Sequence, residues 1–140
     1  MRVVVTGGSG KAGSAIIPEL LEHGHEVLSV DTAPRDGSTP FMRANVTDFG
    51  QTLSVLNGAD WVIHMAAIPS PRSDPPEVVF STNTVSTWNV LQAAEVLGIT
   101  KLVLASSVNA VGLHSPARPS LLSTSQSTRS IPHGPRTLTA

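Results

Sequence analysis

The pattern of apolar and polar residues divides the first 112 positions into alternating strands and helices. Short β-branched or apolar runs predict buried strands at residues 2–6, 26–31, 41–45, 60–67 and 101–107. Apolar residues at helical spacing predict helices between them, at residues 12–23, at a short stretch ending near residue 56, and at residues 77–97. Because strand and helix alternate, the sequence predicts a parallel sheet covered by helices on both faces.

Two of the predicted helices carry apolar stripes that we expect to face the sheet. The stripe of the first helix consists of Ala12, Ala15, Ile16, Leu20 and Leu21. The stripe of the long helix consists of Val79, Phe80, Val90, Leu91, Ala94 and Leu97. Glycine follows each helix, as is common where the chain leaves a helix, at Gly24, Gly58 and Gly98.

The composition changes after residue 112. More than half of residues 115–140 are serine, threonine or proline, and no strand or helix period continues there. We therefore expect residues 1–112 to form one incomplete α/β domain and residues 113–140 to form a disordered or irregular tail. A truncated or frame-shifted end explains the abrupt change most simply, and a functional tail is the alternative.

Charge and cysteine content exclude several classes of protein. The formal net charge of the 140 residues is -1, with no arginine-rich block, so we expect no nucleic-acid partner. The sequence contains no cysteine, which excludes a disulfide framework and a thiolate metal site. No signal-peptide or membrane-span pattern is present, so we expect a cytoplasmic protein without membrane contact.

A glycine-rich turn joins the first predicted strand to the first predicted helix. The segment Thr6-Gly7-x-x-Gly10-x-x-Gly13 also contains the pattern Gly8-x-Gly10-x-x-Gly13. Glycines permit a tight turn without Cβ atoms, so that phosphates can approach the N–H groups at the start of the helix. The last glycine lets the helix pack closely on the sheet. This turn predicts a site for the pyrophosphate of a dinucleotide.

Asp31 supports the dinucleotide interpretation and indicates which dinucleotide binds. It ends the second predicted strand eighteen residues after Gly13, close to the roughly 20 residues expected for an acid that binds the ribose hydroxyls. A carboxylate there accepts hydrogen bonds from the ribose of NAD and repels the 2′-phosphate of NADP. NAD is therefore the expected cofactor, although Arg35 lies near enough in sequence to weaken the discrimination against NADP.

On these motifs, residues 1–112 resemble the extended short-chain dehydrogenase/reductase superfamily, of the NAD-dependent epimerase/dehydratase type. The resemblance includes TGGSGKAG at the turn, VIHMAA at the fourth strand and STNTVSTWNVL in the long helix. Asn45 departs from the family, which has an aspartate beside the adenine, but its amide can still bond the base. The resemblance assigns cofactor contacts to Gly7, Gly10, Lys11, Ala12, Gly13, Asp31, Asn45, Val46, Met65, Ala66, Ala67 and Asn83.

The same resemblance implies one catalytic residue in this chain, but the sequence lacks two other catalytic residues of the family. Ser107, in SSVNAVG, matches the family's catalytic hydroxyl, although on spacing alone it is equally well a plain strand-end serine. The family adds a tyrosine acid/base and a lysine that lowers the pKa of the tyrosine. The sequence contains no tyrosine, and its lysines, Lys11 and Lys101, stand elsewhere. We therefore expect little or no turnover from this chain alone.

The resemblance implies a Rossmann-like doubly wound sheet with strand order 3-2-1-4-5 and ligand bound where that order reverses. The first functional hypothesis is that the chain is the NAD-binding portion of an epimerase/dehydratase-like oxidoreductase that acts on a sugar nucleotide or similar hydroxylated substrate. The alternative is a non-catalytic dinucleotide-binding sensor or interaction module. A third hypothesis is a homo-oligomer in which the fifth strand, an exposed edge, pairs with a second copy.

The histidines predict no metal site. His64 lies in the middle of an apolar strand, where a buried histidine held by local hydrogen bonds is the simpler interpretation. The remaining four, His23, His25, His114 and His133, share no ligand spacing. His114 follows Ser107 closely enough to be considered as a substitute base, but it falls where the composition changes.

Overall fold

The computed structural model describes residues 1–34, 37–70 and 73–107 of the 140-residue chain. Contacts divide the chain into residues 1–105 and residues 106–140, and all the described elements lie in the first unit. The strands are β1 (Arg2–Thr6), β2 (Glu26–Asp31), β3 (Phe41–Arg43), β4 (Trp61–His64) and β5 (Leu102–Leu104). The helices are α1 (Lys11–Glu22), α2 (Phe49–Leu56) and α3 (Pro76–Leu97).

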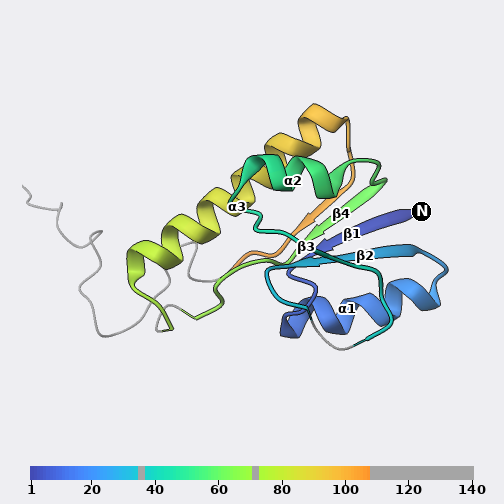
Figure 1. Ribbon diagram of the computed structural model, residues 1–140, viewed down its shortest axis with the longest axis horizontal. Helices are drawn as coiled ribbons and strands as arrows, with labels where there is room; N and C mark the ends of the chain where they lie inside the picture. Colours follow the sequence, from blue (N-terminus) through green and yellow to red (C-terminus); the bar gives the residue numbers. More distant parts are fainter. Residues whose placement is uncertain (35–36, 71–72, 108–140) are drawn as a thin grey trace, which may run out of the picture. The chain divides into compact units, whose positions relative to one another are not determined.

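The five strands form one sheet in the order β3-β2-β1-β4-β5, and every pair is parallel (Figure 1). This confirms the predicted Rossmann-like topology. Thr6 of β1 pairs with Val30 of β2 on one side and with His64 of β4 on the other. The carboxyl ends of these three strands therefore lie level with one another, at the point where the strand order reverses.

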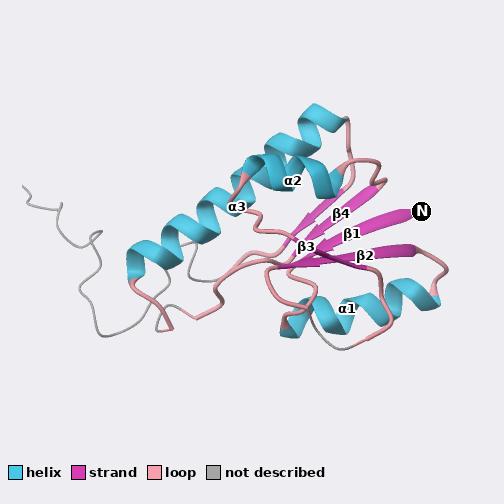
Figure 2. Ribbon diagram, viewed as in Figure 1, coloured by secondary structure: helices cyan, strands magenta, loops and turns pink. Residues whose placement is uncertain are grey.

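Helices cover both faces of the sheet, as predicted, with α1 on one face and α2 and α3 on the other (Figure 2). Alternate strand residues point to opposite faces and build two separate cores. Val3, Val5 and Ile63 pack with α1 through Ile17 and Leu20. On the opposite face, the strand residues Val4, Val30 and Val62 pack with Val55, Leu56, Val90, Ala93 and Ala94 of the two other helices.

The predicted stripe of α1 is correct at Leu20 and in part at Ile16, which packs against the core, and wrong at its other positions. The buried residues of this helix are Gly13, Ile17 and Leu20, whereas Ala12, Ala15 and Leu21 are exposed. Gly13 does not belong to the predicted apolar stripe, yet it is buried and packs against the backbone of Gly7 and Gly8. The backbone contact at glycine sets which side of α1 faces the sheet.

In the stripe predicted for α3, the buried residues occur only in the second half of the helix, and not at every position there. Val90 and Ala94 are buried, but Phe80 is 72% exposed and Leu91 is 42% exposed. The 22 residues of α3 span roughly 33 Å at 1.5 Å per residue, whereas the strands beneath it have three to six residues. The first turns of α3 extend beyond the sheet, so its buried residues begin only at Ser86.

Three strands end earlier than the sequence pattern predicts. The structure ends β3 at Arg43, β4 at His64 and β5 at Leu104. Apolar residues after the first two of these ends, such as Val46 and Met65, continue the strand pattern but leave the sheet to line the cleft described below. The predicted irregular tail at residues 113–140 lies outside the described residues, as does Arg35.

Two classes of site are not found in the part of the chain that is described. None of its helices is both long enough and apolar enough to cross a membrane. In the same residues, no group of three or more histidine, aspartate or glutamate side chains is arranged to hold a metal ion.

Candidate functional site

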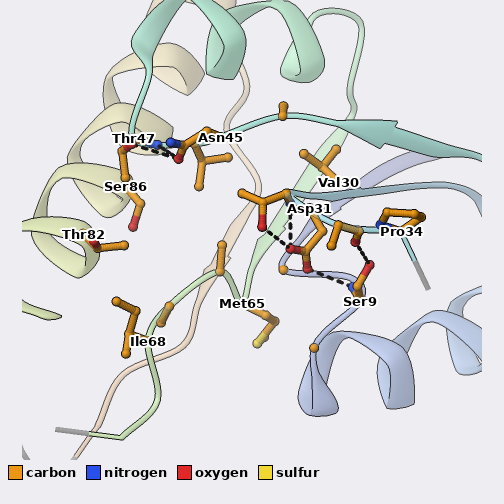
Figure 3. A pocket seen from close by; sticks show the side chains of 18 residues that line it. Ser9, Val30, Asp31, Pro34, Asn45, Thr47, Met65, Ile68, Thr82 and Ser86 are labelled. Carbon is orange, nitrogen blue, oxygen red and sulfur yellow. Dashed lines mark hydrogen bonds between the residues drawn. The ribbon is translucent and has the colours of Figure 1, made fainter. Parts of the chain in front are cut away.

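A cleft of about 760 Å³ opens at the carboxyl ends of the strands (Figure 3). Segments that follow β1, β2, β3 and β4 form its walls, and α3 contributes Thr82 and Ser86. The other lining residues lie at the end of β2 or in the loops: Gly7, Ser9, Gly10, Val30, Asp31, Thr32, Ala33, Pro34, Ala44, Asn45, Val46, Thr47, Met65, Ala66, Ala67 and Ile68. Its volume lies within the roughly 300–1,000 Å³ of small-molecule and cofactor sites.

Gly7 sets the path of the glycine-rich turn. Its φ angle is +71°, a left-handed conformation that favours glycine. A Cβ atom at this position would lie 2.5 Å from the backbone nitrogen of Ala66 and 2.6 Å from the carbonyl carbon of Met65. The turn after β1 therefore packs directly on the backbone that follows β4. Only glycine fits both the conformation and the space.

Gly13 brings α1 against the same turn. A Cβ atom there would overlap the carbonyl oxygen of Gly7 and lie 2.7 Å from Cα of Gly8. The helix begins at Lys11, and its N-cap residue, Gly10, provides no side-chain hydrogen bond. Since the first N–H groups of a helix lack partners within it, this end of α1 can bind an anion such as a pyrophosphate.

Among the described residues that line the cleft, Asp31 carries the one charged side chain. Its Oδ1 accepts a hydrogen bond from the backbone N–H of Thr32 at 2.7 Å, and its Oδ2 accepts one from the N–H of Ser9 at 3.1 Å (Figure 3). The Ser9 hydroxyl also donates to the carbonyl of Ala33 at 2.7 Å. The Thr32 hydroxyl also donates to Oδ1, at 3.4 Å. A carboxylate offers about four lone-pair positions, so Asp31 retains acceptor capacity for a ligand hydroxyl.

The segment after β3 forms the wall beyond Asp31. The Asn45 Oδ1 atom accepts hydrogen bonds from the backbone N–H and the hydroxyl of Thr47, at 3.0 and 2.8 Å. The carbonyl of Val46 accepts from the Asn89 amide of α3 at 3.0 Å and from the Thr52 hydroxyl at 3.1 Å. This wall is therefore tied both to its own turn and to two helices.

The segment after β4 forms the opposite wall and is held by Asn83 of α3. The Asn83 Oδ1 atom accepts from the backbone N–H of Ile68 at 2.8 Å, and its Nδ2 donates to the carbonyl of the same residue at 3.1 Å. Asn83 does not line the cleft. Its amide instead fixes the position of a residue that does.

His64 lies beneath the cleft and is 3% exposed. Its Nδ1 atom lies 2.6 Å from the Thr6 hydroxyl, and its Nε2 atom lies 3.4 Å from the Thr87 hydroxyl. Burial disfavours the charged ring and lowers the pKa of His64 from 6.5 to about 4. The ring is therefore neutral at physiological pH. These contacts confirm the expectation of a buried histidine held by local hydrogen bonds.

Of the residues that the resemblance assigned to the cofactor, eight line the cleft: Gly7, Gly10, Asp31, Asn45, Val46, Met65, Ala66 and Ala67. Lys11, Ala12 and Gly13 form the adjoining first turn of α1, and Asn83 acts on the wall from behind. Ser107 is exposed and belongs to the unit formed by residues 106–140. Its catalytic role stays a prediction.

Several lining residues were missed by sequence reasoning. Most stand one to three positions from a motif residue, as Ser9 and Thr32 do, so the motifs mark the segments but not every member. Thr82 and Ser86 are four residues apart on α3 and therefore share one face of that helix. The motif marks Asn83 between them, and the packing of α3 beside the cleft shows that Thr82 and Ser86 line it.

The parallel sheet, the glycine turn and the carboxylate at the end of β2 together define a Rossmann-type nucleotide-binding domain. The NAD dependent epimerase/dehydratase family matches this chain over residues 3–138, which extends past the 112 residues covered by the motifs. The chain belongs to this family.

Among curated relatives, a 3 beta-hydroxysteroid dehydrogenase/Delta 5-->4-isomerase from Mycobacterium tuberculosis is 31% identical over 120 residues, which are 79% of this chain and 32% of that protein. A UDP-glucose 4-epimerase from Corynebacterium glutamicum is 29% identical, over 80% of this chain and 36% of its own length. This chain spans about a third of the length of these relatives.

Solved structures agree with the fold. A UDP-glucose 4-epimerase from Bifidobacterium longum, in complex with NAD+ and UDP, has a TM-score of 0.71 at 26% identity, over 80% of this chain and 38% of its own. The Thermus thermophilus UDP-glucose 4-epimerase, in complex with NAD, has a TM-score of 0.68 at 32% identity, over 76% of this chain and 38% of its own.

Proposed function

We propose that this chain binds NAD in the cleft as the NAD-binding portion of an epimerase/dehydratase-like oxidoreductase. One observation carries the proposal: the Asp31 carboxylate, with acceptor positions remaining, stands across a 760 Å³ cleft from the wall after β4, next to an uncapped helix start. Uncapped N–H groups and a carboxylate suit an anion and a diol respectively, and a dinucleotide supplies both on one molecule.

The residues present fit NAD. The backbone N–H groups of the turn and first helical turn, from Gly10 to Gly13, would hold the pyrophosphate. Asp31 would accept from the ribose hydroxyls, and the Asn45–Val46 segment would lie beside the base. Among the described residues, none that lines the cleft is a lysine or arginine, and such a side chain would be needed to offset the 2′-phosphate of NADP beside Asp31. The NAD complexes of solved relatives support the same cofactor.

The substrate we propose is a sugar nucleotide or a similar hydroxylated molecule, as the names of several relatives suggest. NAD, when bound, would supply hydride transfer. Hydride transfer at a hydroxyl-bearing carbon needs a matched proton transfer, which the tyrosine performs in the family. The 140 residues contain no tyrosine, so we expect these residues by themselves to bind the cofactor without turnover. The same observation favours the second candidate, a non-catalytic dinucleotide-binding sensor or interaction module.

Calorimetric titration of the full chain with NAD and NADP tests the proposal. We expect NAD to bind more tightly than NADP. Replacing Asp31 with alanine should weaken NAD binding by about tenfold or more, because hydrogen bonds to a charged group contribute about 1.5–3 kcal/mol. Asp74→Ala, an exposed aspartate outside the cleft lining, is the matched control and should bind NAD as the unmodified chain does. A folded chain that binds neither nucleotide would refute the proposal.

A further inference from the structure

A second cavity, of about 340 Å³, lies between α1 and the segment that leads into β3. Four residues of α1 line one side, residues from the stretch 37–41 line the other, and β2 contributes Ser29. In Figure 1 this stretch passes α1 on its way to β3. Among the described residues, none lines both this cavity and the nucleotide cleft. The cavity is therefore a separate space that the proposed NAD site does not use.

Ser29 carries the only buried hydroxyl among the described residues that line this cavity. Its side chain points to the same face of the sheet as Val27, two residues earlier, which packs with α1. Ser29 is 6% exposed, and no described residue hydrogen-bonds its hydroxyl. Among the described side chains that are not exposed, none has a fully buried nitrogen or oxygen atom without a partner. The Ser29 oxygen must therefore be open to the cavity, where it can bind a ligand.

The other walls combine further hydroxyls with apolar side chains. Ile17 and Leu21 of α1 and Phe41 of β3 supply the apolar part. Phe41 pairs with Ser29 across the two strands, so both side chains point to the same face of the sheet. Displacing loosely held water from such walls by an apolar group gains affinity. The walls therefore favour an organic ligand over water.

The size and the charge of the cavity restrict its ligand. A cavity of about 150 Å³ holds one benzene ring, so a cavity of about 340 Å³ suits a body of about two rings. No described residue that lines it is charged, and a charged ligand would lose its water without gaining an ion pair. We therefore expect a ligand that is small, mostly apolar and uncharged.

We infer that this cavity is a second small-molecule site, which takes an uncharged compound with an apolar body of about two rings and one hydroxyl or carbonyl group. The Ser29 hydroxyl hydrogen-bonds that polar group, and the apolar body packs against Ile17, Leu21 and Phe41. Ligand binding here does not depend on the proposed NAD site, because the two spaces have different lining residues.

The probe that tests this site is 2-naphthol, which has two fused rings, one hydroxyl and no charge at neutral pH. It is titrated into the full chain while the NMR shifts of the backbone amides are followed. We expect saturable shifts at Gly8, Gly37 and Ser38, which line the cavity, with a dissociation constant below about 1 mM. 2-Naphthoate has the same rings with a carboxylate, so it should bind more weakly than 2-naphthol.

Ser29→Ala removes the hydroxyl and changes little else. It should weaken 2-naphthol binding by about 3–10-fold, which is the effect of one hydrogen bond. The urea midpoint should not fall, because the hydroxyl has no hydrogen-bond partner among the described residues. A lower midpoint with unchanged affinity for 2-naphthol would overturn the inference, because the hydroxyl would then stabilise the fold and not the ligand.

Leu21→Asp adds a charge to the apolar wall, and Leu91→Asp is its matched control. Leu21 is 43% exposed and Leu91 is 42% exposed, and Leu91 lies on α3 outside the cavity lining. Both new carboxylates remain in contact with water, so we expect both variants to fold. Only Leu21→Asp should weaken 2-naphthol binding, by about fivefold or more, because it removes an apolar contact.

A titration without saturable shifts would overturn the inference, as would shifts confined to residues that line the nucleotide cleft. Equal weakening of 2-naphthol binding in Leu21→Asp and Leu91→Asp would also overturn it. Titration of NAD into the same samples tests the proposed function separately, so either proposal can fail while the other stands.

Discussion

Replacing Gly7 with alanine separates two physical reasons for a glycine in the nucleotide turn. A left-handed residue with a Cβ atom costs roughly 1–2 kcal/mol. The Cβ of Gly7→Ala would also lie 2.5–2.6 Å from backbone atoms of Met65 and Ala66, roughly 1–1.5 Å inside the 3.5–4.0 Å of a favourable contact. Overpacking of this kind costs about 1–3 kcal/mol. We therefore expect Gly7→Ala to lower the free energy of unfolding by about 2–5 kcal/mol.

Gly24 provides the matched control. Its φ angle is +77°, close to that of Gly7, but a Cβ atom there would meet nothing within 4 Å. Gly24→Ala should therefore show only the conformational cost of about 1–2 kcal/mol. Urea unfolding followed by tryptophan fluorescence measures both variants. With a slope of about 1–3 kcal/mol per molar urea, the steric difference shifts the midpoint by roughly 1 M. Equal destabilisation of the two variants would refute the steric argument.

The same pair of variants connects the turn to binding. Relieving the overlap at Gly7 requires Met65 and Ala66 to move, and both residues line the cleft. We expect Gly7→Ala to weaken NAD binding by about tenfold or more, while Gly24→Ala leaves it unchanged. If Gly7→Ala loses stability but binds NAD normally, the cleft does not depend on this contact.

Variants at three further residues test the groups behind the cleft. The pKa of His64 is about 4 in the folded chain, so between pH 6.5 and pH 4 the unfolded chain binds a proton at His64 that the folded chain does not. The free energy of unfolding should therefore fall by about 3 kcal/mol over this range. Urea titrations across the same range should show that His64→Gln lacks this component. Asn83→Ala removes both hydrogen bonds to Ile68 and should lower the free energy of unfolding by about 1–3 kcal/mol. Calorimetry should also show weaker NAD binding. Normal binding would contradict the role that we assign to Asn83. Asn89→Asp places a carboxylate against the carbonyl of Val46, whereas Asn89→Leu leaves that carbonyl its hydrogen bond from Thr52. Asn89→Asp should therefore destabilise the fold more than Asn89→Leu. Equal urea midpoints of the two variants would argue against the contact between Asn89 and Val46.

The alternation of strands and helices and the position of the cleft could be predicted because they depend on local signals, whereas the strand order was implied by the family resemblance. A strand buried on both faces has to be apolar throughout, and β1 shows this in Val3, Val4 and Val5. The glycine turn and Asp31 could be recognised because one backbone conformation and one charge each require a particular residue type. Such signals can be recognised in the sequence without knowing which segments pack together.

The predictions that failed concern packing between distant segments. Phe80 and Val90 look alike in the sequence of α3, and only the length of the sheet beneath the helix decides that Val90 is buried and Phe80 exposed. Met65 continues the apolar pattern of β4, yet β4 ends at His64 because the next residues turn toward the cleft. The local pattern of apolar residues does not show where a strand stops pairing with the neighbouring strands.

Helix α3 connects packing between distant segments to the geometry of the site. It holds both walls of the cleft, although Thr82 and Ser86 are its only described residues that line the cleft. Asn83 and Asn89 are six residues apart, which separates them by roughly 9 Å along the helix and rotates them by about 240° around it. One therefore reaches the wall after β4 and the other the wall after β3. Since β3 and β4 stand at different positions in the sheet, a rigid helix that binds both walls sets the width of the cleft. Substitutions in α3 that touch no ligand should thus change how well the cleft fits a nucleotide.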